Sequence, residues 1–314
     1  MRFFIAIFLG VLLLPNVYGG GDFHIHRSYD LDNDGQSETL VLNSRFSSAM
    51  WVEISPEGIN DTLWSYSLGG GGTFADGEVV DVNNDAYEDL ILIPNLNVSI
   101  GEQVWFYIFL GKKNGFSNQP LTIKEPLLDL TTLRPSNLSL VPGGSPKLTM
   151  SFGSPVRQGL VFDIDVANDV ALIKSPQLLS APIISNGYGA VYVGGFMSSG
   201  GHYIALISSE RDKLKTAIFD VGTGFELIGS EVMKVDDARY LLGSDIQPYT
   251  SEVSEQTGLL IPYGSDHIFL LSIDGESAAL SSTSLSGQGT FPIDDEVSLH
   301  SILKLRENKE WILQ

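Results

Sequence analysis

Short runs of β-branched, aliphatic and aromatic residues recur along the chain, and most are bounded by Gly, Ser, Asn, Asp or Pro. Such runs are typical of β-strands, because branched and aromatic side chains suit a pleated sheet and the bounding residues suit turns. The apolar spacing of three and four residues that indicates helices is hard to find after residue 20. The pattern therefore predicts an all-β protein.

Five of these runs have the character of inner strands and recur at a regular interval. One marker residue from each gives Leu40, Ile91, Leu148, Ile204 and Leu260, separated by 51, 57, 56 and 56 residues. The runs that follow keep a similar interval, with markers Val52, Phe106, Phe162, Ile218 and Phe269. A period in the low fifties with about four strands per unit is typical of a β-propeller, whose sheets bury both faces only when stacked.

The interval predicts five four-stranded blades between residue 23 and about residue 285. The segment 291–314 either pairs with the first blade to close the ring or begins a further unit, so up to seven blades are compatible with the sequence. A pair of two-sheet sandwiches is the competing prediction, because short strands suit that fold as well.

Residues 1–19 are predicted to be a secretory signal peptide. Met1 and Arg2 give a basic start, 3–14 is an apolar run, and small residues precede a cleavage point near Gly19. The run is shorter than the about 20 residues that a membrane-spanning helix needs. We therefore expect a secreted or periplasmic protein, with 20–314 forming a single domain that is not inserted in a membrane after cleavage.

The charge of the chain argues against two classes of partner. Once Arg2 is removed with the signal peptide, 17 basic residues stand against 38 acidic ones, a net charge of −21. Such a field repels nucleic acids and anionic lipid surfaces and favours cations. The chain has no cysteine, so disulfides cannot contribute to its stability.

A first candidate metal loop lies directly before the strand that starts near Thr39. Its oxygen-bearing side chains are Asp30, Asp32, Asp34 and Glu38, at loop positions 1, 3, 5 and 9, with Gly35 at position 6 for a sharp turn. Calcium takes six to eight oxygen ligands, and alternate acidic residues on a tight loop can point their carboxylates at one ion. The backbone carbonyl of Gln36, at position 7, would add another ligand.

A second loop of the same pattern begins 51 residues later and again precedes a strand. Its candidate ligands are Asp81, Asn83, Asp85 and Asp89 at positions 1, 3, 5 and 9, with Tyr87 at position 7. An EF-hand would need a bidentate Glu at position 12 and flanking helices, whereas position 12 here is Val41 or Leu92. Two copies at the same place in a unit predict two calcium sites, against the alternative of acidic turns without an ion.

These loops and the strands after them resemble FG-GAP or VCBS repeats, the blades of integrin-α-like and bacterial propellers. Those repeats contain Asp-x-Asn-x-Asp-Gly-x-x-Asp followed by an apolar strand, and the turn residues 109–111 and 114–116 also resemble the family. The resemblance covers roughly 22–120, and it implies a calcium-binding propeller whose ligands are the residues listed for the two loops.

Two departures from the family pattern affect the loops. Ala86 replaces glycine at position 6 of the second loop, which predicts backbone strain, and Glu38 replaces Asp at position 9 of the first. No metal loop is expected in the later units. Asp163 and Asp165 are predicted to be outward strand residues and not ligands.

A search for catalytic motifs gives no positive signal. His24 and His26 share a strand face without a third ligand nearby, and no nucleophile elbow, P-loop or zinc-protease motif is present. The sequons at Asn60, Asn97 and Asn137 are glycosylation acceptors only in a eukaryotic secretory pathway.

The favoured hypothesis is a secreted, non-enzymatic propeller that binds calcium and uses its loop face to bind a protein partner or act as a scaffold. The alternative is a carbohydrate-binding or polysaccharide-degrading propeller, which would need Trp51, Trp64, Trp105 or Tyr188 as exposed stacking platforms. Their strand positions favour burial instead. The sequence predicts no oligomeric state.

Overall fold

The computed structural model describes residues 23–32, 34–43, 47–55, 58–68, 72–95, 104–113, 115–124, 135–143, 146–188, 190–210, 212–235, 246–250, 257–263, 267–274 and 277–284. These residues form five antiparallel four-stranded sheets, a small two-stranded hairpin and one helical turn. The all-β prediction is confirmed. The predicted signal peptide (1–19) and the segment 291–314 lie outside the described residues.

The five sheets, numbered here in chain order, take up consecutive parts of the chain. Sheet 1 contains β1 (Phe23–Tyr29), β2 (Ser37–Asn43), β3 (Ser48–Ser55) and β4 (Gly58–Ser67), and sheet 2 contains β5 (Thr73–Val80), β6 (Asp89–Asn95), β7 (Phe106–Phe109) and β10 (Leu121–Ile123). Sheet 3 contains β11 (Pro135–Leu140), β12 (Lys147–Phe152), β13 (Gln158–Ala167) and β14 (Val170–Leu179). Sheet 4 contains β15 (Val191–Ser198), β16 (Gly201–Glu210), β17 (Lys213–Asp220) and β18 (Glu226–Lys234), and sheet 5 contains β19 (Gln247–Thr250), β20 (Thr257–Tyr263), β21 (His267–Asp274) and β22 (Ser277–Ser284). The hairpin is β8 (Gly111–Lys112) with β9 (Gly115–Phe116), and the helical turn is α2 (Pro182–Ser185).

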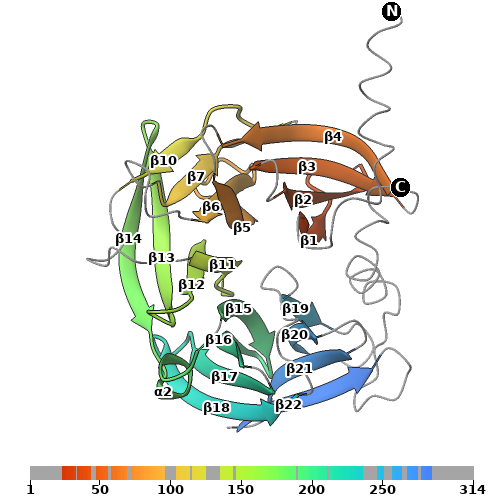
Figure 1. The fold of residues 1–314 in the computed structure, drawn as a ribbon. Coiled ribbons are helices and arrows are strands. Elements are labelled where there is room, and N and C mark those ends of the chain that lie inside the picture. Colours follow the sequence, from red (N-terminus) through yellow and green to blue (C-terminus); the bar gives the residue numbers. More distant parts are fainter. Residues whose placement is uncertain are drawn as a thin grey trace, which may run out of the picture.

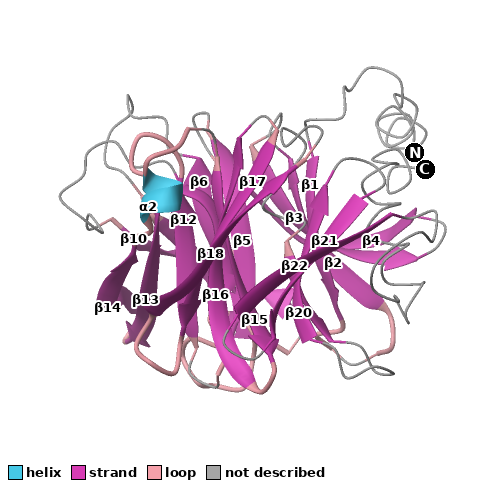
Figure 2. Cartoon of the chain, turned by 90° about the horizontal axis from the view of Figure 1, so that it is seen from below, coloured by secondary structure: helices cyan, strands magenta, loops and turns pink. Residues whose placement is uncertain are grey.

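The sheets are arranged one after another around a common centre (Figure 1). The first strand of each sheet lies nearest the centre and the last strand lies at the periphery. Neighbouring first strands contact one another, as β5 does with β11, β11 with β15, and β15 with β19. The view from below shows the strands running between two ends of the molecule, where the loops gather (Figure 2).

The strand positions predicted from the marker spacing agree with the structure. The first set of markers, from Leu40 to Leu260, lies in the second strand of each sheet, and the second set lies in the third strand. The described sheets begin at Phe23 and end at Ser284, close to the predicted limits of 23 and 285. A pair of two-sheet sandwiches does not describe this arrangement.

The second strand of sheet 2, β6, is apolar at four consecutive positions, 90–93, because both faces of its sheet are buried. Along β6, Leu90 and Leu92 pack in a cluster with sheet 1, whereas Ile91 and Ile93 pack in a cluster with sheet 3. Two further clusters join sheets 3 and 4 and sheets 4 and 5. Burial of one such side chain stabilises the fold by about 1.5–3 kcal/mol, so the stacked sheets are held mainly by these layers.

Buried polar side chains add hydrogen bonds between successive sheets near the centre. Tyr29 donates its hydroxyl to Glu78, and the Leu138 N–H donates to the Asp76 carboxylate at 2.7 Å. Between sheets 4 and 5, Ser198 Oγ accepts from the Ile273 N–H at 2.9 Å. These bonds fix the offset between neighbouring sheets, which apolar packing alone leaves less specified.

The side chain of Asn137 links sheets 3 and 4 through hydrogen bonds. Its amide donates to the Val193 carbonyl at 2.7 Å and accepts from the Val193 N–H at 2.8 Å and the Ser151 hydroxyl at 2.6 Å. The side chain is only 2% exposed. The Asn137 sequon is therefore inaccessible to glycosylation in the folded protein.

Replacing Asn137 with alanine is expected to lower the free energy of unfolding by about 2–3 kcal/mol, because buried groups of Val193 and Ser151 lose their partners. Urea denaturation followed by circular dichroism measures the change. Ser139→Ala removes the acceptor of the Gly195 N–H at 3.2 Å and a long bond to the Leu140 carbonyl at 3.5 Å. It is the matched control and should cost less, because Ser139 is only partly buried. Equal effects of the two substitutions would contradict the importance given to Asn137.

Candidate metal site

The two predicted metal loops occupy the same place in successive sheets. The first connects β1 to β2 and the second connects β5 to β6, so each joins the innermost strand to the second strand. Position 9 of each loop lies in the following strand, as Glu38 in β2 and Asp89 in β6. Both position 9 side chains are buried, with exposures of 2% and 0%.

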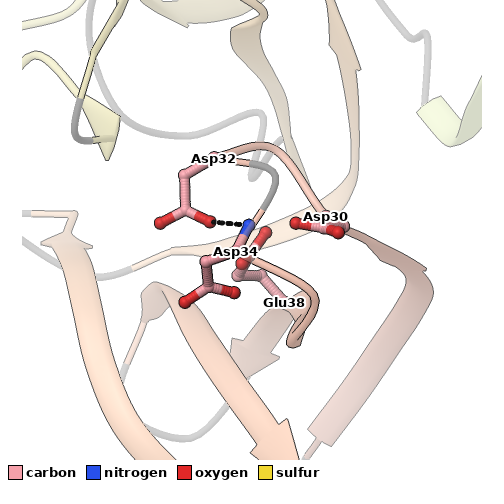
Figure 3. A group of neighbouring side chains, drawn as sticks. All are labelled: Asp30, Asp32, Asp34 and Glu38. Carbon is pink, nitrogen blue, oxygen red and sulfur yellow. Dashed lines mark hydrogen bonds between the residues drawn. The ribbon is translucent and has the colours of Figure 1, made fainter.

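The first loop brings four acidic side chains together, as predicted. Asp30, Asp32, Asp34 and Glu38 each offer one carboxylate oxygen, and these oxygens all lie within 4.8 Å of one another. Figure 3 shows the four side chains as neighbours around the turn. Glu38 belongs to β2 and is buried, whereas the three aspartates are exposed. An oxygen set of this size and spacing suits a hard divalent cation.

Backbone hydrogen bonds hold the first loop in shape. The Asp34 N–H donates to Asp32 Oδ1 at 3.2 Å, and the Gln36 N–H donates to Asp34 Oδ1 at 2.8 Å. The Leu31 N–H donates to Glu38 Oε2 at 2.8 Å and ties the start of the loop to the following strand. The loop thus uses three of its own carboxylates to fix its backbone.

The second loop repeats these three hydrogen bonds position by position. The Asp85 N–H donates to Asn83 Oδ1 at 2.9 Å, and the Tyr87 N–H donates to Asp85 Oδ1 at 2.9 Å. The Val82 N–H donates to Asp89 Oδ2 at 2.9 Å. The two loops differ in sequence at most positions. Even so, the side chains at positions 3, 5 and 9 accept the same backbone hydrogen bonds in both loops.

The loops differ in how many hydrogen bonds their side-chain oxygens already accept. Asp81 accepts the N–H groups of Asp85 and Ala86 at 3.2 and 3.0 Å, and the Asn83 amide donates to Asp85 Oδ2. Asp89 accepts from Gly111 as well as from Val82. Within the described part of the chain, the acidic side chains of the second loop do not form a close group like that of the first.

Position 6 has a positive φ in both loops, 85° at Gly35 and 72° at Ala86. The expected strain at Ala86 is therefore present, because a side chain in this region of φ is disfavoured relative to glycine. At position 7, the backbone of Gln36 and that of Tyr87 are each fixed by an N–H bond to the position 5 carboxylate. Their carbonyl oxygens as metal ligands stay a prediction.

The position 9 carboxyls have raised pKa values. Burial raises the pKa of Glu38 most, and the charges of Asp32, Asp30 and Asp34 raise it further, against the lowering effect of the Leu31 N–H. Burial likewise raises the pKa of Asp89, against the N–H groups of Gly111 and Val82. By contrast, hydrogen bonds from Gln36 lower the pKa of the exposed Asp34 carboxyl. A cation placed among the first loop's oxygens would reverse the repulsion that acts on Glu38.

Glu38→Gln is expected to stabilise the chelator-treated protein at about pH 7 and to weaken its response to calcium. The folded state holds the Glu38 proton more tightly than the unfolded chain, whose pKa is near 4.5. Wild-type stability from this group is therefore present below that pKa and is lost as pH rises through the raised value. Thermal melts of both proteins from about pH 4 to pH 8 measure the difference, which should grow with pH; a constant difference would contradict it.

Asp163 and Asp165 lie in β13, as the prediction of strand residues has it. Asp163 pairs with Lys147 at 2.8 Å and Asp165 with Lys174 at 3.5 Å, so both act as strand residues in ion pairs. In sheet 4 a two-residue turn, Ser199-Gly200, replaces the metal loop. His24 and His26 lie in β1, and their side chains are outside the described part of the structure.

Two polar contacts of the structure were not predicted from the sequence. One is the bond from the Gly111 N–H to Asp89 Oδ1, at 2.6 Å, which connects the second loop to the β8–β9 hairpin. The other is a buried ion cluster of Arg157, Glu210 and Lys215. Arg157 and Glu210 are 53 residues apart in the sequence, which is about one repeat unit. Because equivalent positions of successive sheets lie side by side, this spacing was the signal that could have indicated the contact.

No helix in the described part of the chain has the length and apolar character needed to cross a membrane. No protein-family model matches the chain, and no curated protein sequence matches it significantly.

Proposed function

We propose that this protein is a secreted, calcium-binding β-propeller with five four-stranded blades, of the FG-GAP or VCBS kind, that serves as a protein-binding or scaffold module. The single observation that carries the proposal is the repetition of three hydrogen bonds in the two acidic loops, at the same connection of sheets 1 and 2. The radial arrangement of the sheets supports the propeller part (Figure 1).

The first loop fits calcium better than a transition metal or magnesium. Its donors are carboxylate oxygens, with no histidine or cysteine among them. Carbonyl and water oxygens would complete the coordination, and calcium accepts such a larger and more variable set more readily than the strictly octahedral magnesium. In this proposal Asp30, Asp32 and Asp34 hold the ion from the turn, and Glu38 anchors it to β2.

The ion would have a structural role. It would neutralise carboxylates that otherwise repel one another, and it would tie the turn to the strand behind it. The two loops lie at one end of sheets 1 and 2, so calcium would order part of the loop face. We propose that the protein partner binds to this loop face. The basis is analogy with other proteins of this fold class.

The carbohydrate alternative is weakened by the positions of the aromatic residues. Trp51, Trp64 and Trp105 are buried, with exposures of 2%, 6% and 2%, and cannot act as stacking platforms. Tyr188, at 56% exposed, is the candidate that remains of those four. A glycan array on the calcium-loaded protein tests this alternative, and specific sugar binding lost in Tyr188→Ala would revive it.

Isothermal titration of calcium into the chelator-treated mature protein tests the proposal. We expect saturable binding that is much tighter for calcium than for magnesium, with the first loop as the stronger site. Asp30→Ala should weaken that site by at least about tenfold, since it removes one charged ligand. Absence of calcium binding at millimolar concentration would overturn the metal part of the proposal.

A further inference from the structure

Among the described residues, four buried apolar side chains stand apart from the rest of the core. The other buried apolar side chains all belong to one of the four clusters that join successive sheets. The exceptions have exposures of 2%, 0%, 3% and 0%, and they are Val41, Val52, Leu260 and Leu270. Two lie in sheet 1 and two in sheet 5, which are the first and the last sheet of the series (Figure 1).

In sheet 1 the exceptions lie on the face turned away from sheet 2, called here the terminal face of sheet 1. Trp51 of β3 packs in the cluster with sheet 2. Side chains alternate along a strand, so its neighbours Met50 and Val52 point to the opposite face. Val41 of β2 is paired directly with Met50 and therefore shares that face.

In sheet 5 the exceptions lie on the face turned away from sheet 4, called here the terminal face of sheet 5. Leu271 and Ile273 of β21 pack in the cluster with sheet 4. By the same alternation, Leu270 and the half-buried Ser272 point to the opposite face. Leu260 of β20 is paired directly with Leu270 and shares its face.

The two terminal faces do not cover one another. Every other pair of successive sheets is in contact through the first strand of the later sheet, as β5 is with β2 and β19 with β15. In the described part of the chain, no comparable contact joins a strand of sheet 1 to a strand of sheet 5. Side chains that are at most 3% exposed must nevertheless be covered. The cover therefore comes from parts of the chain outside the described ranges.

The segment 291–314 has a sequence suited to this cover. It follows sheet 5, whose last strand β22 ends at Ser284. Apolar residues occupy four of the five odd-numbered positions in 297–305, and a second apolar run occupies 311–313. Alternation of this kind is typical of a strand with one face on a core. The segment thus offers apolar side chains next to the sheet that needs them.

Charge and processing also favour this segment. In 297–314 three Lys and Arg residues stand against two Glu residues, a net charge of +1 in a chain whose net charge is −20. Opposite charge favours its association with the rest of the molecule. The other long apolar run outside the described ranges, 3–14, belongs to the predicted signal peptide and is removed from the mature chain.

We propose that the segment 291–314 packs between sheets 5 and 1 and covers the terminal faces of both, in addition to the five four-stranded sheets. The four side chains are already buried within a single chain, which favours cover by the chain itself over cover by a second copy. The segment would then close the ring and hold sheet 1, which carries the first acidic loop, from its second side. This inference is independent of calcium binding.

Disulfide trapping in the full mature chain tests the proposal, because the chain has no cysteine of its own. Met50→Cys places a thiol on the terminal face of sheet 1, and Ser272→Cys places one on that of sheet 5. Each is combined with one cysteine in the segment, and the protein is oxidised under native conditions. We expect a disulfide within one chain for at least one pair on each face, identified by mass spectrometry of unreduced peptides. The segment substitutions are Leu299→Cys, Leu303→Cys, Leu305→Cys and Ile312→Cys.

Ser209→Cys is the matched control. Ser209 is half-buried like Ser272, but it lies in β16 of sheet 4, both of whose faces pack on described sheets. It should form no disulfide with the same segment positions. Disulfides that form only between two chains, or only as often as with the control, would overturn the proposal and leave the calcium proposal standing. Trapping at one face alone would refute closure of the ring.

Hydrogen exchange of the unmodified mature chain decides the question if a cysteine variant does not fold. Amides of 297–305 that exchange far more slowly than an unstructured peptide would support the cover, because only packed and hydrogen-bonded segments are protected. Exchange at the rate of an unstructured peptide throughout 291–314 would overturn it.

Discussion

Replacing Glu210 with alanine is expected to lower the free energy of unfolding by about 3–5 kcal/mol, because it leaves a buried guanidinium without its counter-ion. Arg157 is 1% exposed, and its Nη2 lies 3.1 Å from Glu210 Oε1. The second carboxylate oxygen lies 2.6 Å from Lys215 Nζ. Burial lowers the pKa of Arg157, and the charge of Glu210 opposes that effect. The Glu210 carboxylate therefore offsets part of the free-energy cost of burying the Arg157 charge.

This cluster also joins three separate elements of the fold. Arg157 precedes β13 in sheet 3, and its Nε donates to the Ile184 carbonyl in α2. Glu210, in β16 of sheet 4, also accepts the Tyr188 N–H at 3.1 Å. The loss of Glu210 should therefore loosen both the helical turn and the junction of sheets 3 and 4.

Urea denaturation of Glu210→Ala measures the effect, with the double variant Arg157→Met, Glu210→Leu as the control. Removing both charges together should cost less than removing Glu210 alone, since the buried Arg157 charge is removed with its partner, and Lys215, whose side chain is 17% exposed, can be hydrated. A loss below about 1 kcal/mol in the single variant, or a double variant that is the less stable of the two, would show that water reaches Arg157 and that the pair is not buried as described.

Calcium is expected to raise the melting temperature of the chelator-treated protein by several degrees. At a calcium concentration about 100 times the dissociation constant, one site stabilises the folded state by about 2.7 kcal/mol. In a domain of this size each kcal/mol corresponds to roughly 2–4 °C. Most of this gain should disappear in the variant Asp30→Asn, Asp34→Asn, which removes two of the four clustered carboxylates.

The control for that experiment is Asp163→Asn, Asp165→Asn. It removes the same two charges from β13, where each aspartate pairs with a lysine. This variant should keep the full calcium response, even if its own melting temperature is lower. An equal loss of response in both variants would mean that calcium acts by general charge screening and not at the loop.

The strands could be predicted from the sequence because burial on both faces leaves a strong local signal. Leu90 to Ile93 is a continuous apolar run, and its two alternating sets of side chains pack against different neighbouring sheets. The first acidic loop was predictable for a similar reason: its donors lie within nine consecutive positions, so their meeting depends on local turn geometry alone. The strain at Ala86 follows from the same local argument.

Contacts between sheets were less accessible from the sequence, since they depend on the offset of one sheet against the next. Nothing local to Arg157 indicates that it is buried, and its partner Glu210 is 53 residues away. The engagement of Asp89 by Gly111 is of this kind, and it distinguishes the second loop from the first. The sequence pattern treats the two loops as equals, whereas the structure brings together the acidic group of the first alone among the described residues.

The most direct measurement is X-ray diffraction from crystals grown with calcium, recorded at a wavelength where calcium scatters anomalously. An ion between Asp30, Asp32, Asp34 and Glu38, with oxygen distances of about 2.3–2.6 Å, is the predicted result, with a second and weaker peak beside Asp81 and Asp89. Crystals that show those four carboxylates turned toward solvent, with no anomalous peak among them at saturating calcium, would contradict it.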